Sequence, residues 1–141
     1  MSDAMTGADF EAEFEDGRFG RLAVVRLKPD QDLVEGIEAA AMEAGIAYGV
    51  VRAAVGSLVD AALGYGEAED ASIVTVEGPG IEILTLAGEL RPDENGQARA
   101  LLQGTISDAD AKVYGGTFLR GANPICITLE LVLQEWVPEA S

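Results

Sequence analysis

The spacing of hydrophobic residues predicts one α-helix in this chain, over residues 33–44. Apolar side chains recur there every three or four residues, which places them on one side of a helix. Asp32 followed by Glu35 is typical of a helix N-terminus, and Gly45 is typical of a helix end. The apolar side comprises Leu33, Ile37, Ala40, Ala41 and Ala44, whereas Glu35, Glu38 and Glu43 lie elsewhere.

Most of the remaining chain has the period-two alternation, or the short apolar runs between glycine and proline, that are typical of strands. Residues 125–134 alternate most clearly, because every second residue is isoleucine or leucine. Residues 20–29 are apolar at consecutive positions, which predicts a strand buried on both faces. The predicted strands cover residues 20–29, 48–66 with a bend at Gly56 and Ser57, 72–78 ending in a Gly-Pro-Gly turn, 81–90, 98–106, 113–119 and 123–136.

One helix among six or seven strands predicts an α+β domain, a mostly antiparallel sheet with the helix packed on one face. Several strands are apolar on both faces, and a single helix cannot cover both faces of such a sheet. We therefore expect the second apolar face to meet another subunit in an obligate oligomer.

The chain of 141 residues is organised as one domain with short ends. Residues 1–17 hold six acids and no base, and we expect a poorly ordered acidic arm there. The folded domain is expected over residues 18–137, followed by a tail over residues 138–141. A single cysteine and an N-terminus without a basic-then-apolar signal pattern predict a cytoplasmic protein with no membrane segment.

Charge and composition narrow the possible functions. Twenty-five acids against nine bases give a net charge of −16, which disfavours binding to nucleic acid because that binding draws on basic patches. The chain contains no histidine, the commonest general base and metal ligand. Nucleophilic sites that need histidine, and histidine zinc sites, are therefore excluded, and we expect no enzyme activity and no cofactor.

Five segments in this order resemble the PPC domain, the plants-and-prokaryotes-conserved domain that follows AT-hooks in plant nuclear proteins. The segments are VVRLKPDQDLVEGIEAAAMEAGI, AAVGSLVDAAL, VEGPGIEILTLAGEL, ISDADAKVYGGTFLRG and ITLELVL. The resemblance implies a sheet with one prominent helix, a homotrimer and membership of a predicted DNA-binding family. In the plant relatives the AT-hook contacts DNA, and no Arg-Gly-Arg-Pro element occurs in this sequence.

The resemblance also implies a metal site that this sequence lacks the ligands for. Many prokaryotic relatives carry histidines at the positions that are Leu101, Gln103 and Thr117 here, and those histidines can hold a metal such as zinc. Gly115 and Gly116 are interpreted as the structural part of that motif, kept for the backbone geometry of a bend. A bulge, or the close approach of another backbone or a ligand, is the other usual reason for glycine within a strand. The family glycine of the acidic turn is Ala111 here.

Two groups of residues are candidates for a functional role. Gln103, Thr117 and Arg120, with Gly115 and Gly116 beside them, are predicted to line a small polar pocket.

Glu82 and Glu130 lie in apolar strands and are interpreted as structural or interface carboxylates. They are expected either to hydrogen-bond the backbone or to pair with an arginine at a subunit boundary, with Arg52 and Arg120 as candidate partners. A pair of catalytic carboxylates is the alternative. Cys126 is predicted to be a buried small hydrophobic residue, and Asp108 and Asp110 to form a turn.

The leading hypothesis is a non-enzymatic, self-associating domain that binds protein partners or a small ligand. The first alternative is direct DNA binding, which would need a local basic patch in the assembly. The second is a degenerate enzyme that uses Glu82 or Glu130.

Overall fold

The computed structural model describes residues 11–66 and 72–139, and this part of the chain folds as an α+β domain. Residues 11–16 have no regular secondary structure; the rest of the predicted acidic arm, residues 1–10, lies outside the described residues, as do residues 140 and 141. The elements are β1 (Gly17–Leu27), α1 (Leu33–Ala44), β2 (Gly49–Tyr65), β3 (Ser72–Pro92), β4 (Ala98–Ser107), β5 (Val113–Phe118) and β6 (Ile125–Pro138).

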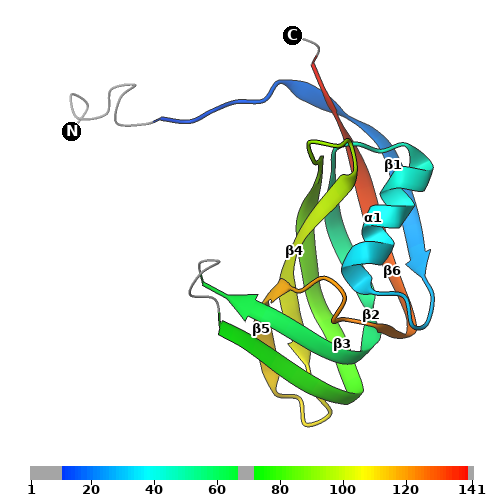
Figure 1. Cartoon of the computed structure of the whole chain (residues 1–141), viewed down its shortest axis with the longest axis vertical. Coiled ribbons are helices and arrows are strands. Elements are labelled where there is room, and N and C mark those ends of the chain that lie inside the picture. The colour runs from blue at the N-terminus through cyan, green and yellow to red at the C-terminus, as the bar shows by residue number, and fades with distance from the viewer. Residues whose placement is uncertain (1–10, 67–71, 140–141) are drawn as a thin grey trace.

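The six strands form one antiparallel sheet in the order β1-β6-β2-β3-β4-β5. An additional pairing between β2 and β5 joins Leu63 to Phe118 and Gly64 to Thr117. The four strands β2, β3, β4 and β5 therefore form a closed ring of paired strands. The helix α1 contacts β1 and β4, which are four positions apart in the sheet, because the sheet curves around it (Figure 1). The predicted mostly antiparallel sheet with one helix is confirmed.

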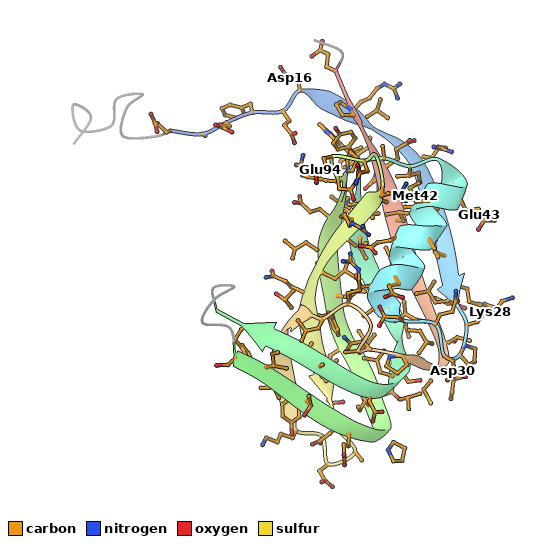
Figure 2. All side chains as sticks on the ribbon, in the orientation of Figure 1. Asp16, Lys28, Asp30, Met42, Glu43 and Glu94 are labelled. Atoms are coloured by element: carbon orange, nitrogen blue, oxygen red, sulfur yellow. The ribbon has the colours of Figure 1, made fainter. Side chains whose placement is uncertain are left out.

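The predicted ends of the helix are confirmed. The Asp32 carboxylate accepts a hydrogen bond from the Glu35 amide at 3.0 Å, as an N-cap does. Gly45 ends the helix in the left-handed conformation, with φ of 70°. Glu43 points away from the body of the protein, on the exposed side of α1 (Figure 2).

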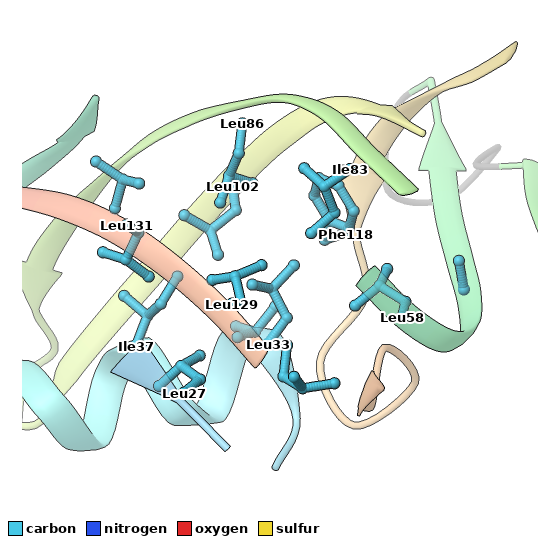
Figure 3. Close-up of a cluster of buried hydrophobic side chains, with 14 of the residues drawn as sticks. Leu27, Leu33, Ile37, Leu58, Ile83, Leu86, Leu102, Phe118, Leu129 and Leu131 are labelled. Atoms are coloured by element: carbon cyan, nitrogen blue, oxygen red, sulfur yellow. The ribbon is translucent and has the colours of Figure 1, made fainter. Parts of the chain in front are cut away.

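A hydrophobic core fills the space between α1 and the sheet (Figure 3). Leu33 and Ile37 from the helix, and Leu129 from β6, are completely buried. Each such side chain contributes roughly 1.5–3 kcal/mol when it leaves water. Leu27, Leu58, Ile83, Leu86, Leu102, Phe118 and Leu131 complete the part of this cluster labelled in the figure.

The predicted turn at Gly78-Pro79-Gly80 is wrong, because β3 runs without interruption from Ser72 to Pro92. The register explains the difference. Leu58 pairs with Ile81 and Asp60 with Glu77, so the three residues of the Gly-Pro-Gly segment lie opposite Val59 alone as a bulge. A Cβ at Gly78 would lie 1.9 Å from the Val59 carbonyl oxygen, so the close approach of the two strands requires glycine there.

The strand predicted over residues 20–29 forms as β1, but the expectation that it is buried on both faces is wrong in this protomer. Among the described strands it lies at the edge of the sheet and pairs with β6, and Leu22 and Val24 are 66% and 74% exposed. Ile127, expected on the buried face of β6, is 70% exposed because the β2–β6 register shifts between Leu129 and Ile125. The helix of the described residues is too short to cross a membrane.

Candidate functional site

The sheet has a second face, away from α1, that carries exposed apolar residues, and we call it the outer face. Residues paired across neighbouring strands share a face, so the register assigns its members. One row across five strands consists of Leu22, Gln134, Val50, Glu89 and Leu101; a second consists of Val24, Val132 and Ala53; a third consists of Arg26, Glu130 and Val55.

Several apolar members of the outer face are exposed to solvent. Val55 is 76% exposed, and Leu101, at the far end of the first row, is 54% exposed. A shallow groove of about 200 Å³ runs between Val24, Val55 and Val132. Exposed apolar residues grouped on one face favour an interaction with another molecule.

The charged residues of the outer face are tied to neighbouring side chains. Glu130 forms an ion pair with Arg26, in which Arg26 Nε donates to the carboxylate at 2.9 Å. Arg52 donates to the Gln134 side chain at 2.8 Å. The sequence-based choice of Arg52 or Arg120 as the partner of Glu130 is therefore wrong, because Arg26 lies opposite Glu130 on the adjacent strand.

Glu82 is exposed on β3, where it pairs in register with Ser57 and Ser107. The strand β2 lies between β3 and the β6 strand that carries Glu130. The two carboxylates therefore occupy separate strands of the sheet, and the contacts that the structure gives Glu130 are those of an ion pair.

The residues at the expected metal positions lie together. Gln103 on β4 pairs with Thr117 on β5, and the Gln103 amide nitrogen lies 3.3 Å from the Thr117 hydroxyl. Leu101 precedes them on the same side of β4. Among residues 11–66 and 72–139 no group of three or more histidine, cysteine, aspartate or glutamate side chains is arranged to hold a metal.

Arg120 does not join Gln103 and Thr117, so the predicted polar pocket is not assembled in the protomer as expected. Arg120 Nε donates to Glu38 on α1 at 3.2 Å, and the guanidinium thus turns toward the helix side of the sheet. This hydrogen bond to Glu38 raises the pKa of Arg120 above its ordinary value.

The double glycine of β5 accommodates the close approach of another backbone. Gly116 has a φ of 154°, and a Cβ there would lie 2.7 Å from the Gly64 carbonyl oxygen of β2. The adjoining residues form the β2–β5 pairing that closes the strands on themselves. Gly116 therefore serves the architecture of the sheet.

Ala111, at the position of the family glycine in the acidic turn, adopts a left-handed backbone conformation. Its φ is 63°, a conformation that costs an alanine about 1–2 kcal/mol relative to the right-handed region. Asp108 stabilises the turn, because its carboxylate accepts hydrogen bonds from the Asp110 and Lys112 amides. These hydrogen bonds, with that of Lys112 foremost, hold the pKa of Asp108 below its ordinary value.

Glu38 has a structural role that the sequence pattern did not indicate. It is 7% exposed, although the helical spacing placed it outside the apolar stripe. Its carboxylate accepts a hydrogen bond from the Ala100 amide of β4 at 2.9 Å, pairs with Arg120 and lies 3.8 Å from Arg99. Glu38 thereby fastens α1 to β4 and to the chain that follows β5.

Asn123 is a second residue whose role sequence reasoning missed. It is fully buried, and its amide donates to the carbonyls of Ala62 and Leu119 and accepts from the Ala62 amide. Its own backbone donates to Asp32 at the start of α1. The position after Gly121 and before Pro124 was the available signal, since asparagine is common in turns.

Cys126 is exposed, so the prediction of a buried cysteine is wrong. It lies next to Ile127, in the part of β6 where the register with β2 shifts, and the shift overrides the alternation of the sequence.

The chain matches a known protein family over most of its length. Residues 14–137 match the family profile of the Plants and Prokaryotes Conserved (PCC) domain. The chain therefore belongs to this family, which is the PPC domain named above.

Solved structures share the fold. A metal-containing protein of Archaeoglobus fulgidus superposes with a TM-score of 0.77 at 24% identity, covering 92% of this chain and 89% of the other. A PPC protein of Pyrococcus horikoshii superposes with a TM-score of 0.79 at 19% identity, covering 91% of this chain and 87% of the other. A candidate DNA-binding protein of Bacteroides thetaiotaomicron superposes with a TM-score of 0.70 at 18% identity, covering 84% of this chain and 83% of the other.

Similarity at the sequence level extends to a longer protein. The bifunctional protein GlmU of Synechococcus sp. strain JA-3-3Ab is 33% identical over 115 residues, which is 82% of this chain. The similar region makes up 17% of the length of that relative, about a sixth.

Proposed function

We propose that this protein is a non-enzymatic, self-associating module, a cytoplasmic homotrimer whose outer sheet face is the contact between copies. The observation that carries the proposal is the row structure of that face. Apolar residues recur across neighbouring strands there, and Val24 and Val55 are about three quarters exposed, at 74% and 76%. A second copy that covered these residues would remove their apolar surface from water.

The pattern of charge on the outer face supports self-association. Arg26 and Glu130 form their ion pair in the third row, so that row presents no unpaired charge to an incoming surface. Desolvation of a pair that is already neutralised costs less than desolvation of a single charge. The absence of histidine from the whole sequence and the ion pairing of Glu130 support a role without catalysis.

The relationship to GlmU supports an accessory role. In that protein the similar segment is a small part of a longer chain that is named for two functions. A domain that accompanies other machinery in one chain is suited to assembly or partner binding when it occurs separately. Protein partners, or a small ligand, are therefore proposed for the assembled form.

A charge substitution on the outer face tests this proposal. Val55→Asp places a carboxylate next to Glu130 and at the centre of the proposed contact, and we expect light scattering to report the mass of one copy. Ala39→Asp, on the exposed side of α1, adds the same charge away from the sheet and is expected to keep the wild-type mass. Equal masses for both variants would refute the outer face as the contact.

Direct DNA binding is the second candidate function, because similar structures include candidate DNA-binding proteins. The placement of the basic residues argues against it, since arginines that would contact phosphates already pair with carboxylates. The arginines in such pairs are Arg21, Arg26, Arg91, Arg99 and Arg120. Fluorescence polarisation with duplex DNA at low salt is expected to show no binding, and saturable binding there would favour DNA.

A further inference from the structure

A small cleft lies at the end of the sheet where β1, β2, β3 and β6 meet the start of the chain. Its volume is about 170 Å³, which is room for roughly six water molecules at ~30 Å³ each. A single six-membered ring with one substituent has a similar size. The cleft is lined by Glu15, Phe19, Tyr48, Gly49, Val50, Glu89, Leu90, Arg91 and Trp136.

Aromatic side chains form one wall of the cleft. Phe19 and Trp136 are paired across β1 and β6, with ring centroids 5.6 Å apart and planes inclined at 76°. The Trp136 amide donates to the Tyr48 carbonyl at 2.9 Å, which fixes the third aromatic residue beside them. Edge-to-face rings of this kind offer a flat, apolar surface to a third ring.

Arg91 supplies a cation at the rim, and it already binds a carboxylate there. Its two terminal nitrogens donate to the two carboxylate oxygens of Glu15 at 3.1 and 2.9 Å, the planar bidentate arrangement that guanidinium groups favour. A more distant contact joins Arg91 Nε to Glu89 at 3.4 Å. The hydrogen bond from Arg91 lowers the pKa of Glu15 below its ordinary value.

Glu15 reaches Arg91 from a segment outside the sheet. Residues 11–16 extend away from the folded body, and Asp16 lies at the point where they join β1, above the β3–β4 turn that carries Glu94 (Figure 2). Phe14, immediately before Glu15, is 87% exposed. The carboxylate of Glu15 is therefore held mainly by Arg91, and a different carboxylate could take its place.

We propose that this cleft is a binding site for a small aromatic monocarboxylate, and that Glu15 is its internal competitor. The ligand carboxylate takes the bidentate place of Glu15 on Arg91, and the ring packs against Phe19 and Trp136. The planar fork of arginine selects a carboxylate over a neutral or cationic group of the same size. This site goes beyond the proposed self-association, and it adjoins the proposed contact because Val50 and Glu89 belong both to the cleft and to the first row of the outer face.

The tether makes Glu15 a strong competitor. A group attached by a short segment acts at an effective concentration on the order of millimolar, so a free ligand must exceed that to displace it. The net charge of −16 further weakens binding of any anion. Substitution of Glu15 removes the competitor and one negative charge together, and affinity for the ligand is expected to rise.

Tryptophan fluorescence provides a direct test, because Trp136 is the only tryptophan in the chain. Full-length protein is titrated with benzoate, and with benzyl alcohol and benzylamine as neutral and cationic probes that carry the same ring. We expect benzoate to change the emission of Glu15→Gln with an apparent Kd at least tenfold lower than for wild type. Benzyl alcohol and benzylamine are expected to have at least tenfold weaker effects.

Two substitutions of Arg91 complete the test. Arg91→Met is expected to abolish the benzoate response, and Arg91→Lys, which keeps the charge but loses the fork, to weaken it by tenfold or more. Unchanged urea midpoints establish that each variant is folded. No benzoate response in Glu15→Gln, an equal response to benzyl alcohol, a preference for benzylamine, or full binding by Arg91→Lys would each overturn the proposal.

Discussion

The two faces of the sheet are built from alternate residues of the same strands, yet they have opposite environments. On β6, Leu129 is completely buried under α1, whereas its neighbour Glu130 lies on the outer face beside Val55, which is 76% exposed. Both faces carry aliphatic residues. The difference shows that an apolar residue in this sheet is buried only where another element covers it, and α1 covers one face.

The carboxylates of the two faces repeat this contrast. Glu38, on the helix side, is 7% exposed and contacts Ala100, Arg99 and Arg120. Glu130, on the outer face, has a half-exposed side chain that pairs with Arg26. The helix-side contacts therefore stabilise the protomer, and the outer face remains available for a second molecule.

Truncation of leucine on each face should give the largest difference. Leu129→Ala is expected to lower the free energy of unfolding by about 3 kcal/mol, because it leaves a cavity in the core. Leu101→Ala, the matched change on the outer face, is expected to cost less than about 1 kcal/mol when the protomers are dissociated. Urea denaturation at low protein concentration measures both, and equal losses would remove the distinction between the faces.

Neutralisation of the two glutamates sharpens the comparison. Glu38→Gln is expected to lower the free energy of unfolding by about 2 kcal/mol, because hydrogen bonds to a charged, buried group are lost. Glu130→Gln is expected to cost less than about 1 kcal/mol when the protomers are dissociated, as surface ion pairs do. Thermal unfolding of both variants checks this order, and a larger loss for Glu130 would contradict it.

A turn outside both faces gives a smaller effect of opposite sign. Ala111→Gly is expected to stabilise the protein by about 0.5 kcal/mol, because the relief of a positive φ exceeds the added freedom of the unfolded chain. Ala109→Gly, two residues earlier, relieves no such strain and is expected to destabilise. Differential scanning calorimetry of the two variants would refute the explanation if both shifted Tm downward.

The smallest effect is expected from acid titration of the ion pair between Arg21 and Glu135. This pair lies beside the end of α1, where Arg21 also donates to the Ala44 and Gly45 carbonyls. The hydrogen bond from Arg21 lowers the pKa of Glu135 from 4.5 to about 2. The resulting stability is complete above about pH 4.5 and is lost as the pH falls toward 2, because protonation then breaks the pair. The difference in unfolding midpoint between wild type and Glu135→Gln should therefore shrink from pH 5 to pH 2. A difference independent of pH would contradict this assignment.

The sequence predicted the local elements well where one physical signal dominated. The apolar stripe over Leu33 and Ile37, with Asp32 and Gly45 at its ends, fixes α1, since spacing and caps agree. The Gly-Pro-Gly segment was wrongly predicted to be a turn because its residues are typical of turns. Its pairing opposite Val59, which the sequence pattern does not show, makes it a bulge within β3.

The site was less predictable, because its contacts join residues far apart in the chain. Glu38 belongs to a polar position of the helix pattern, and its burial depends on Ala100 and Arg120, which lie 62 and 82 residues later. The cleft at Arg91 likewise requires Glu15, which is 76 residues earlier. The second apolar face of the sheet, by contrast, could be predicted from the sequence, because several strands have apolar residues on both faces.

Sedimentation equilibrium of the wild-type protein over a concentration series tests the role of the outer face most directly. At micromolar concentration we expect the mass of three copies of the 14.7 kDa chain, because the exposed apolar rows are covered in the assembly. A mass of one copy throughout the series would show that the outer face remains in water, and it would contradict self-association.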